Sequence, residues 1–327
     1  SEGKDDYFQA AAGWYEKHFG WKVEKEWLIK TPGVVFALAM AVKAYTKEGD
    51  AVLLQQPVYY PFSEVITDNH RRLINSPLQQ IDGHYEINFE EFEQKIVEEN
   101  VKLFLMCSPH NPVGRVWKEW ELRKIGDICL KHNVLVVSDE IHSDFTYGEN
   151  IHHVFASLDE KYAAITTTCT APSKTFNLAG LVGSYHIIFN KMLRDRVEAK
   201  SRKSHYNTMN VLSMHALIGA YEAEGYTWVN ELCQVLSENV DYAVNHIRDY
   251  YRGIEVSKPQ GTYMLFLDCE DWCEENYKSL DELLKAGWDV GVAWQDGRPF
   301  HGPCAIRMNL ALPMSRVQEA FDRLDKY

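Results

Sequence analysis

The chain has 327 residues, of which 46% are hydrophobic and 25% charged, enough for two packed domains with their own cores. Acidic residues outnumber basic ones by 47 to 34, and no basic block or stripe is present, so nucleic acid and anionic membranes are excluded as expected partners. No apolar run reaches the length of a membrane span, and the seven scattered cysteines lack metal-ligand spacing, which predicts a metal-free protein in a reducing cytoplasm.

Helix-like and strand-like segments alternate from residue 5 onward. In chain order, the pattern predicts a helix at 5–18, a short apolar segment at 27–30, a helix at 34–45, strands at 51–54 and 72–75, a helix at 89–99, a strand at 102–107, a helix at 118–132, and strands at 134–137, 163–169 and 183–189. Continuous apolar runs such as 102–107 are typical of strands covered on both faces. This alternation predicts an α/β fold in which helices cover both faces of a mostly parallel sheet.

The second part of the chain has a different pattern. Residues 191–251 are helical in character, with interruptions near Gly219 and Gly225. After them, strands at 261–268 and 304–310 alternate with helices at 280–286 and 316–324. We therefore expect a large domain at 1–230 and a smaller α+β domain at 231–327.

Polar residues follow three of the apolar strands. Asn111 lies between a histidine and Pro112, in a turn that must project its amide, and Asp139 directly follows an apolar run. Lys174 lies just past a third strand, where a buried stem and little water would make its amine nucleophilic near neutral pH. Each also has an ordinary interpretation, as a turn amide, a cap or turn aspartate, and a solvated turn lysine. Ligands of open α/β sheets bind at the carboxyl ends of the strands, where these groups together could hold a pyridine ring carrying an aldehyde.

Three motifs carry a family resemblance. They are Asn-Pro-Val-Gly at 111–114, Asp-Glu-Ile-His-Ser-Asp at 139–144 and Ser-Lys-Thr-Phe-Asn-Leu-Ala-Gly-Leu at 173–181. In this order and spacing, they resemble the fold type I pyridoxal-phosphate enzymes of the class I/II aminotransferase family, and most closely its cystathionine β-lyase (C–S lyase) branch called MalY/PatB. The resemblance covers essentially the whole chain. It implies a large domain with a mostly parallel seven-stranded sheet between helices and a smaller α+β C-terminal domain.

The resemblance also implies a role for each group around the cofactor ring. Lys174 would form the Schiff base with pyridoxal 5'-phosphate and then move the Cα proton of the substrate. Asp139 would pair with the pyridinium nitrogen and keep it protonated. Asn111 would donate to the phenolic oxygen, near which His142 takes the place of a tyrosine found in many aminotransferases. Tyr59, in a loop between two prolines, would stack on the ring and lie near the substrate.

Two further roles concern the charged ends of the ligands. Backbone amides at Gly33, Val34 and Val35 match a phosphate-binding helix N-terminus, to which Ser173 could add a hydroxyl. Arg307 matches the arginine that binds the substrate α-carboxylate in the family. The apolar strand around Arg307 favours this role over the alternative, a surface salt bridge. Tyr263 is predicted as a core aromatic that could face the same cavity.

The chain departs from many relatives at positions 171 and 182, where alanine and valine replace a serine and a phosphate-binding arginine. The family also has a further segment before the position of Ser1, and this sequence does not begin with methionine. We therefore expect the N-terminal segment of the family to be missing here. A homodimer with the active site at the subunit interface is expected, and its second subunit is a candidate source of phosphate ligands.

The expected reaction is β-elimination from L-cystathionine or a related L-cysteine S-conjugate, giving a thiol, pyruvate and ammonia. The similarity around 139–144 and 175–181 favours this reaction over the alternative, a class I/II aminotransferase that uses the same lysine, aspartate and arginine. A non-catalytic regulatory homologue or an inactive fragment is a further alternative. A Rossmann dehydrogenase is not supported, because no Gly-x-Gly-x-x-Gly follows an early strand.

Overall fold

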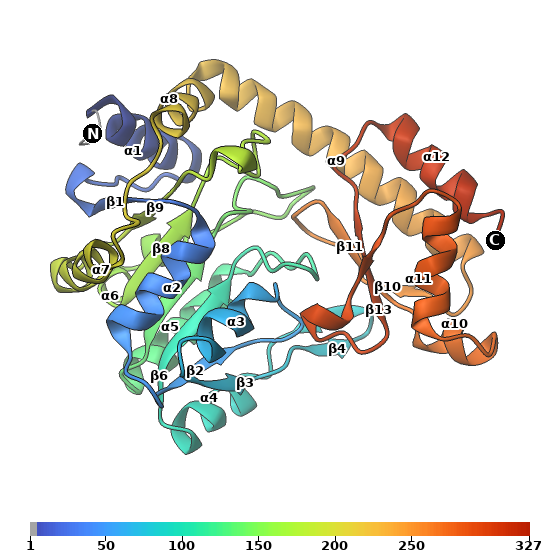
Figure 1. Ribbon diagram of the computed structural model, residues 1–327, viewed down its shortest axis with the longest axis horizontal. Helices are drawn as coiled ribbons and strands as arrows, with labels where there is room; N and C mark the ends of the chain where they lie inside the picture. The colour runs from blue at the N-terminus through green and yellow to red at the C-terminus, as the bar shows by residue number, and fades with distance from the viewer. Residues whose placement is uncertain (1–4) are drawn as a thin grey trace.

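A computed structural model describes residues 5–327 of the protein. A seven-stranded sheet forms the centre of the larger part of the molecule (Figure 1). Its strands, in spatial order, are β1 (Leu28–Thr31), β9 (Ser184–Ile187), β8 (Thr166–Thr170), β7 (Leu135–Asp139), β6 (Val101–Cys107), β2 (Ala51–Leu54) and β3 (Arg72–Asn75). All neighbours from β8 to β3 are parallel, whereas β9 runs antiparallel to both β8 and β1. The mostly parallel α/β sheet predicted from the sequence is confirmed.

Helices cover both faces of this sheet because successive strand residues point to opposite sides. Leu103 and Leu105 of β6 pack in the same apolar cluster as α2 (Val34–Tyr45), α3 (Pro61–Thr67) and α7 (Lys191–Ser204). Phe104 and Met106 pack with α4 (Phe89–Glu98) and α5 (Glu119–Lys131) in a second cluster. Every one of these four strand side chains is buried, which accounts for the continuous apolar run in the sequence.

The edge of the sheet next to β1 and β9 is covered by aromatic side chains. Helix α1 (Asp5–Phe19) packs there with α8 (Val211–Ala220), and Trp14 of α1 stacks on Tyr221 with ring centroids 4.5 Å apart. Short helical turns complete this part: η1 (Lys25–Trp27), η2 (Phe155–Ser157), α6 (Glu160–Ala163) and η3 (Ala179–Leu181).

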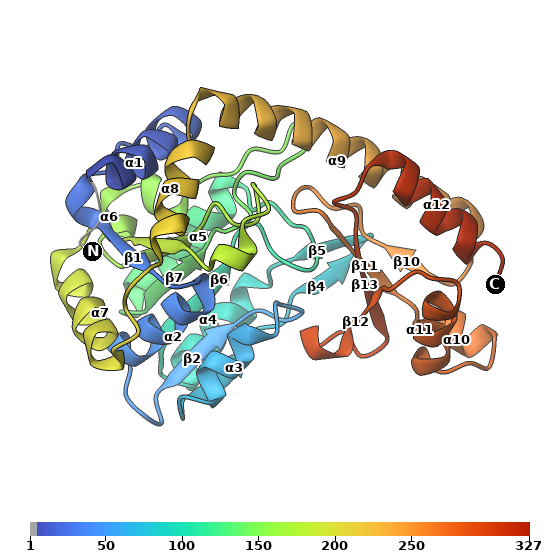
Figure 2. The ribbon, with the colours of Figure 1, turned by 45° about the horizontal axis from the view of Figure 1, so that its top comes forward.

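A long helix, α9 (Ala223–Tyr250), runs from α8 to a second, antiparallel sheet at the other end of the molecule (Figure 2). That sheet has the order β10 (Glu255–Val256), β11 (Met264–Asp268), β13 (Ala305–Asn309) and β12 (Gln295–Asp296). It is accompanied by α10 (Glu270–Glu275), α11 (Leu280–Asp289), η4 (Arg298–Phe300) and α12 (Met314–Leu324). The smaller α+β unit is confirmed, whereas a boundary at residue 230, which lies inside α9, stays a prediction.

The structure corrects several element bounds. Strand β8 begins only at Thr166, because residues 160–163 form α6. The predicted helical stretch 191–251 is three helices, broken at 205–210 and again at 221–222. A hairpin of β4 (Gln79–Ile81) and β5 (His84–Glu86) was not predicted. Within residues 5–327, no helix is both long and apolar enough to span a membrane.

Candidate active site

Three neighbouring strand ends bring the predicted polar groups to one edge of the large sheet. Asp139 at the end of β7 pairs with Cys107 of β6 on one side and with Cys169 of β8 on the other. Asn111 and Lys174 follow these two cysteines by four and five residues. The three groups therefore meet in a cavity of about 330 Å³, a size in the range of small-molecule sites.

All the predicted site residues line this single cavity. They are Val34, Val35, Tyr59, Asn111, Asp139, His142, Ser173, Lys174 and Arg307, and Tyr263 lines it as well. A larger hollow of about 810 Å³ lies between α9, α10, α11 and the end of α12, but none of the predicted residues lines it. The shared cavity supports the predicted set, while the individual roles stay predictions.

Lys174 lies in a tightly hydrogen-bonded turn after β8. The amide of Leu178 donates to the carbonyl of Ser173 (2.9 Å), and the indole of Trp228 donates to the carbonyl of Thr175 (2.9 Å). Burial and the nearby Arg307 guanidinium lower the pKa of Lys174, against the opposing effect of Asp139. A larger share of this amine is therefore neutral near pH 7 than of an ordinary lysine, as a nucleophile or base requires.

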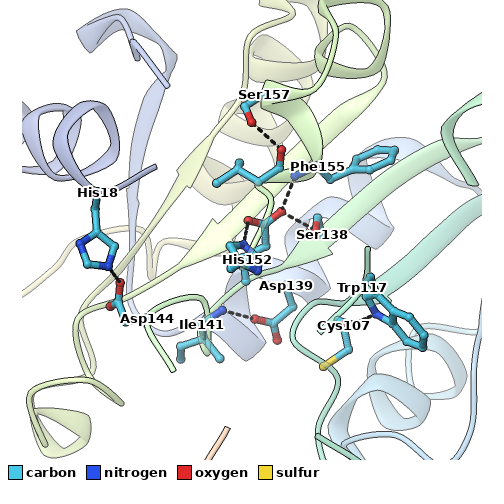
Figure 3. A network of polar contacts seen from close by, with 12 residues as sticks. His18, Cys107, Trp117, Ser138, Asp139, Ile141, Asp144, His152, Phe155 and Ser157 are labelled. Carbon is cyan, nitrogen blue, oxygen red and sulfur yellow. Dashed lines mark hydrogen bonds and ion pairs between the residues drawn. The ribbon is translucent and has the colours of Figure 1, made fainter. Parts of the chain in front are cut away.

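Figure 3 shows Asp139 next to Ile141; the carboxylate is buried and forms no ion pair within residues 5–327. Its Oδ1 accepts from the amide of Ile141 at 3.1 Å, so the turn contact of the ordinary interpretation is present, and the cofactor role stays a prediction. Burial raises the pKa of Asp139 to about 7, although the Ile141 amide and Lys174 both lower it. A cationic ring nitrogen beside this carboxylate would restore its charged form.

The neighbouring Glu140 is not among the residues that line the cavity, and it holds the strand end in place. It is fully buried and accepts from Ser138 Oγ (2.8 Å), His152 Nε2 (2.8 Å) and the amide of Phe155 (3.2 Å). These bonds tie the 152–155 segment to β7 and fix the backbone that carries Asp139. No role was predicted for Glu140. Two adjacent carboxylates at the end of an apolar strand do indicate that one side chain faces each side of the sheet, because successive side chains alternate in direction.

Asp144, the last residue of the second motif, connects the lysine turn to α1. Its carboxylate accepts from Thr175 Oγ1 (2.6 Å) and from the indole of Trp14 (3.2 Å), and His18 Nε2 lies 3.5 Å away (Figure 3). Burial lowers the pKa of His18. Because Thr175 follows Lys174 directly, the hydrogen bonds of Thr175 to Asp144 and Trp228 both hold the lysine turn.

Asn111 and Arg307 contact each other across the two domains. Arg307 Nη1 donates to Asn111 Oδ1 at 3.2 Å, which leaves the amide nitrogen of Asn111 available to donate into the cavity. The amide of Tyr59 donates to the carbonyl of Asn111 (3.0 Å), so the aromatic loop is joined to the same turn. Arg307 also contacts Gln295 and Phe300, two residues that no sequence motif indicated.

His142 is buried beside the cavity, and its Nδ1 has no hydrogen-bond partner in residues 5–327. Burial, with help from Lys174 and Arg307, lowers the pKa of His142 to about 3, so its ring is neutral. The ring lies 5.5 Å from that of Tyr263. A neutral imidazole with a free nitrogen suits a contact with a polar ligand atom.

The start of α2 also lines the cavity, with Gly33, Val34 and Val35. Gly33 has φ of +98°, and a β-carbon there would lie 3.3 Å from Cγ1 of Val182. Among the described residues, no side chain caps this helix, so its first amides are available to bind an anion. Val182 lines the cavity, at the position where many relatives have a phosphate-binding arginine.

Comparison with known proteins identifies the family. The profile of "Aminotransferase class I and II" matches residues 1–324. The chain belongs to this family. It is 36% identical over 318 residues to cystathionine beta-lyase PatB of Bacillus subtilis (strain 168), covering 96% of this chain and 81% of PatB. It is 28% identical to protein MalY of Escherichia coli (strain K12), covering 96% and 80%. Cystalysin from Treponema denticola, whose crystal structure contains pyridoxal 5'-phosphate, superposes with a TM-score of 0.94 at 34% identity, covering all of this chain and 82% of cystalysin.

The cavity fits the cofactor that the resemblance predicts. The underpaired carboxylate of Asp139 suits a protonated ring nitrogen, and the unpartnered Nδ1 of His142 suits a ring oxygen. The amine of Lys174 suits the aldehyde of the cofactor, and the free amides after Gly33 suit its phosphate. These groups come from separate segments of the chain yet line one cavity.

Proposed function

We propose that the protein is a pyridoxal-phosphate-dependent carbon–sulfur β-lyase that cleaves L-cystathionine or a related L-cysteine S-conjugate to a thiol, pyruvate and ammonia. The observation that carries the proposal is the similarity to cystathionine beta-lyase PatB across nearly the whole chain. The predicted lysine, aspartate and arginine around one cavity give that similarity a chemical basis.

Five groups of residues would hold the cofactor. Lys174 would bind its aldehyde carbon, and Asp139 would pair with its ring nitrogen. Asn111 and His142 face its phenolic oxygen, and Tyr59 packs on the ring. The amides of Gly33, Val34 and Val35, together with the hydroxyl of Ser173, face its phosphate. When bound, the cofactor supplies an electron sink that stabilises negative charge at the substrate Cα.

The residues of the chain then bind the substrate and move its proton. Arg307 binds the α-carboxylate, because its guanidinium is half-buried and its described partners carry no negative charge. Lys174, with its lowered pKa, accepts the Cα proton at Nζ. Loss of that proton and departure of the thiolate from Cβ complete the elimination. The thiolate takes up a proton, and hydrolysis of the aminoacrylate product with one water gives pyruvate and ammonia.

A single assay tests this function. Purified protein loaded with pyridoxal phosphate is mixed with L-cystathionine in the absence of any keto acid. We expect pyruvate, ammonia and a free thiol in equal amounts. Strict dependence on a keto-acid acceptor would instead identify an aminotransferase, and no turnover with either would support a non-catalytic homologue. The Lys174→Ala variant should lose roughly 1,000-fold or more of the activity, whereas Lys200→Ala, on the exposed face of α7, should keep it.

The functional unit in this proposal is a homodimer in a reducing cytoplasm. Exposed apolar side chains gather beside the cavity, at Val35, Val182, Tyr206 and Leu212, with exposures of 40%, 49%, 65% and 69%. Three contacts bring these side chains near one another. Phe36, next to Val35, contacts Tyr206, and Val182 adjoins Gly33. The carbonyl of Leu181 accepts from the side chains of Asn210 and Ser213, which flank Leu212 at the start of α8. A second copy of the chain on this surface would cover it and could supply phosphate ligands. The seven cysteines, all of them free, suit a reducing compartment.

A further inference from the structure

The guanidinium of Arg307 is held on three sides. Nη1 donates to Oδ1 of Asn111 at 3.2 Å, and Nη2 donates to Oε1 of Gln295. The plane of the group lies over the ring of Phe300, with 4.5 Å from Cζ to the ring centroid. Gln295 faces Arg307 directly across the β12–β13 ladder, so the strand register sets this contact. The arginine therefore has a defined position before any substrate arrives.

These contacts leave the right number of donors for a carboxylate. Each Nη atom carries two N–H groups, of which one on Nη1 is used by Asn111 and one on Nη2 by Gln295. One N–H on each nitrogen remains, and a carboxylate bound in a bidentate fork requires two. Neutral amide oxygens and a ring hold the cation without neutralising it. An acidic residue in place of Gln295 would form an ion pair with Arg307 and so neutralise the positive charge that binds the substrate carboxylate.

The segment that carries both residues is anchored to the large domain. The carbonyl of Phe300 accepts from the amide of Val58 at 3.2 Å, next to the cavity residue Tyr59. The Phe300 side chain is fully buried and also contacts the ring of Tyr60 at 5.6 Å. Residues 295–300 thus join the strand of Arg307 to the aromatic loop of the other domain.

We infer that Gln295 and Phe300 are positioning residues that aim Arg307 at the α-carboxylate of the substrate and thereby set the affinity for that group. The inference rests on the proposed function for the identity of the substrate. It predicts an effect on KM and little effect on kcat, because the carboxylate is bound equally in the ground state and in the transition state.

Gln295 is exposed, so its replacement removes a hydrogen bond without opening a core. Gln295→Met keeps the length of the side chain and removes the acceptor, and we expect KM for L-cystathionine to rise about 10-fold with kcat within about 2-fold. Gln295→Glu keeps the acceptor and adds a charge that pairs with Arg307, so KM should rise further than in the Met variant. A merely structural role of Gln295 predicts the opposite order, because Glu has the better match in shape and polarity.

A second readout does not depend on turnover. Propanoate has a carboxylate and no amine, and its dissociation constant from the cofactor-loaded protein is obtained from the rise in melting temperature with concentration. We expect Gln295→Met and Gln295→Glu to weaken propanoate in the same order as they raise KM. Phe300→Leu, which removes the ring beneath the guanidinium, should weaken it as well. Gln318→Met, an exposed glutamine on α12, is the matched control and should behave like the wild type.

The outcomes separate this inference from the function on which it rests. If the wild-type protein turns over cystathionine and binds propanoate, and Gln295→Met equals it in both, the positioning role is wrong and the proposed function stands. If the wild-type protein neither reacts with cystathionine nor binds propanoate, the proposed function has failed. Should Phe300→Leu not fold, the two Gln295 variants still decide the question, because their side chain is outside the core.

Discussion

Asp139 has a buried carboxylate that costs the protein stability until a cation is bound next to it. Its pKa lies at about 7, above its ordinary value of 3.8, because burial disfavours the charged form. Between these two pH values, the folded state holds a proton that the unfolded state has released. The free energy of unfolding therefore falls as the pH rises through this window, and the full cost is present above about pH 7.

The Asp139→Asn variant should separate this cost from the function of the residue. Without cofactor, we expect the variant to melt a few degrees above the wild type at about pH 8.5 and close to the wild type at about pH 4, because that pH is near the ordinary pKa of 3.8 and most of the cost has not yet developed there. Added pyridoxal phosphate should raise the melting temperature of the wild type more than that of the variant, because an amide cannot balance a ring cation. Differential scanning calorimetry measures the melting temperatures of both proteins at each pH, with and without pyridoxal phosphate. Equal melting of the two apoproteins at the higher pH would contradict the buried-charge argument, and Asp271→Asn, with an exposed carboxylate, is the control.

At the scale of elements, the turn 111–114 does more than present Asn111 to the cavity. Gly114 has φ of +76°, and a β-carbon there would lie 2.3 Å from Cβ of Pro259. Its carbonyl accepts from the amides of Gln260 (2.8 Å) and Gly261 (3.1 Å), just before β11. The glycine of the Asn-Pro-Val-Gly motif is therefore a contact point between the large and small sheets.

Gly114→Ala should be strongly destabilising, since it adds a steric clash to an unfavourable backbone angle. Gly83 provides a matched control, because its φ is +75° and nothing lies within 4 Å of the position of its β-carbon. We expect Gly83→Ala to cost roughly 1–2 kcal/mol of unfolding free energy, and Gly114→Ala clearly more. Urea unfolding measures both values. Similar costs for the two variants would show that the 259–261 segment moves away easily and does not depend on this contact.

The elements also show which features the sequence could predict. Strands β6 and β7 were predictable because both faces are covered, which leaves a continuous apolar run, and the convergence of Asn111, Asp139 and Lys174 follows from parallel neighbours ending at one edge. The β4–β5 hairpin was missed because its strands are short and largely exposed, although its Asp82-Gly83 turn is a hairpin signal.

Other residues could not be predicted, since tertiary structure alone brings them to the site. Gln295 lies in a two-residue strand twelve positions before Arg307, and only the strand pairing places it against the guanidinium. Trp228 reaches the lysine turn from a helix more than 50 positions along the chain. Neither residue belongs to a motif, and neither position is implied by hydrophobic periodicity.

At the scale of the whole molecule, the proposed dimer predicts that a single charge introduced into its apolar surface will prevent association. Leu212 is 69% exposed at the start of α8 and belongs to the apolar surface beside the cavity. If a second copy covers this surface, Leu212→Asp places a carboxylate in an apolar interface without a partner, which is costly for association and harmless to the monomer fold. Light scattering should then give a mass near 37.8 kDa for the variant and twice that value for the wild type. Leu312→Asp, at a leucine with 47% exposure in the small domain, should keep the wild-type mass. A wild-type mass of 37.8 kDa at all protein concentrations would contradict the dimer, and a variant that stays dimeric would place the interface on another surface.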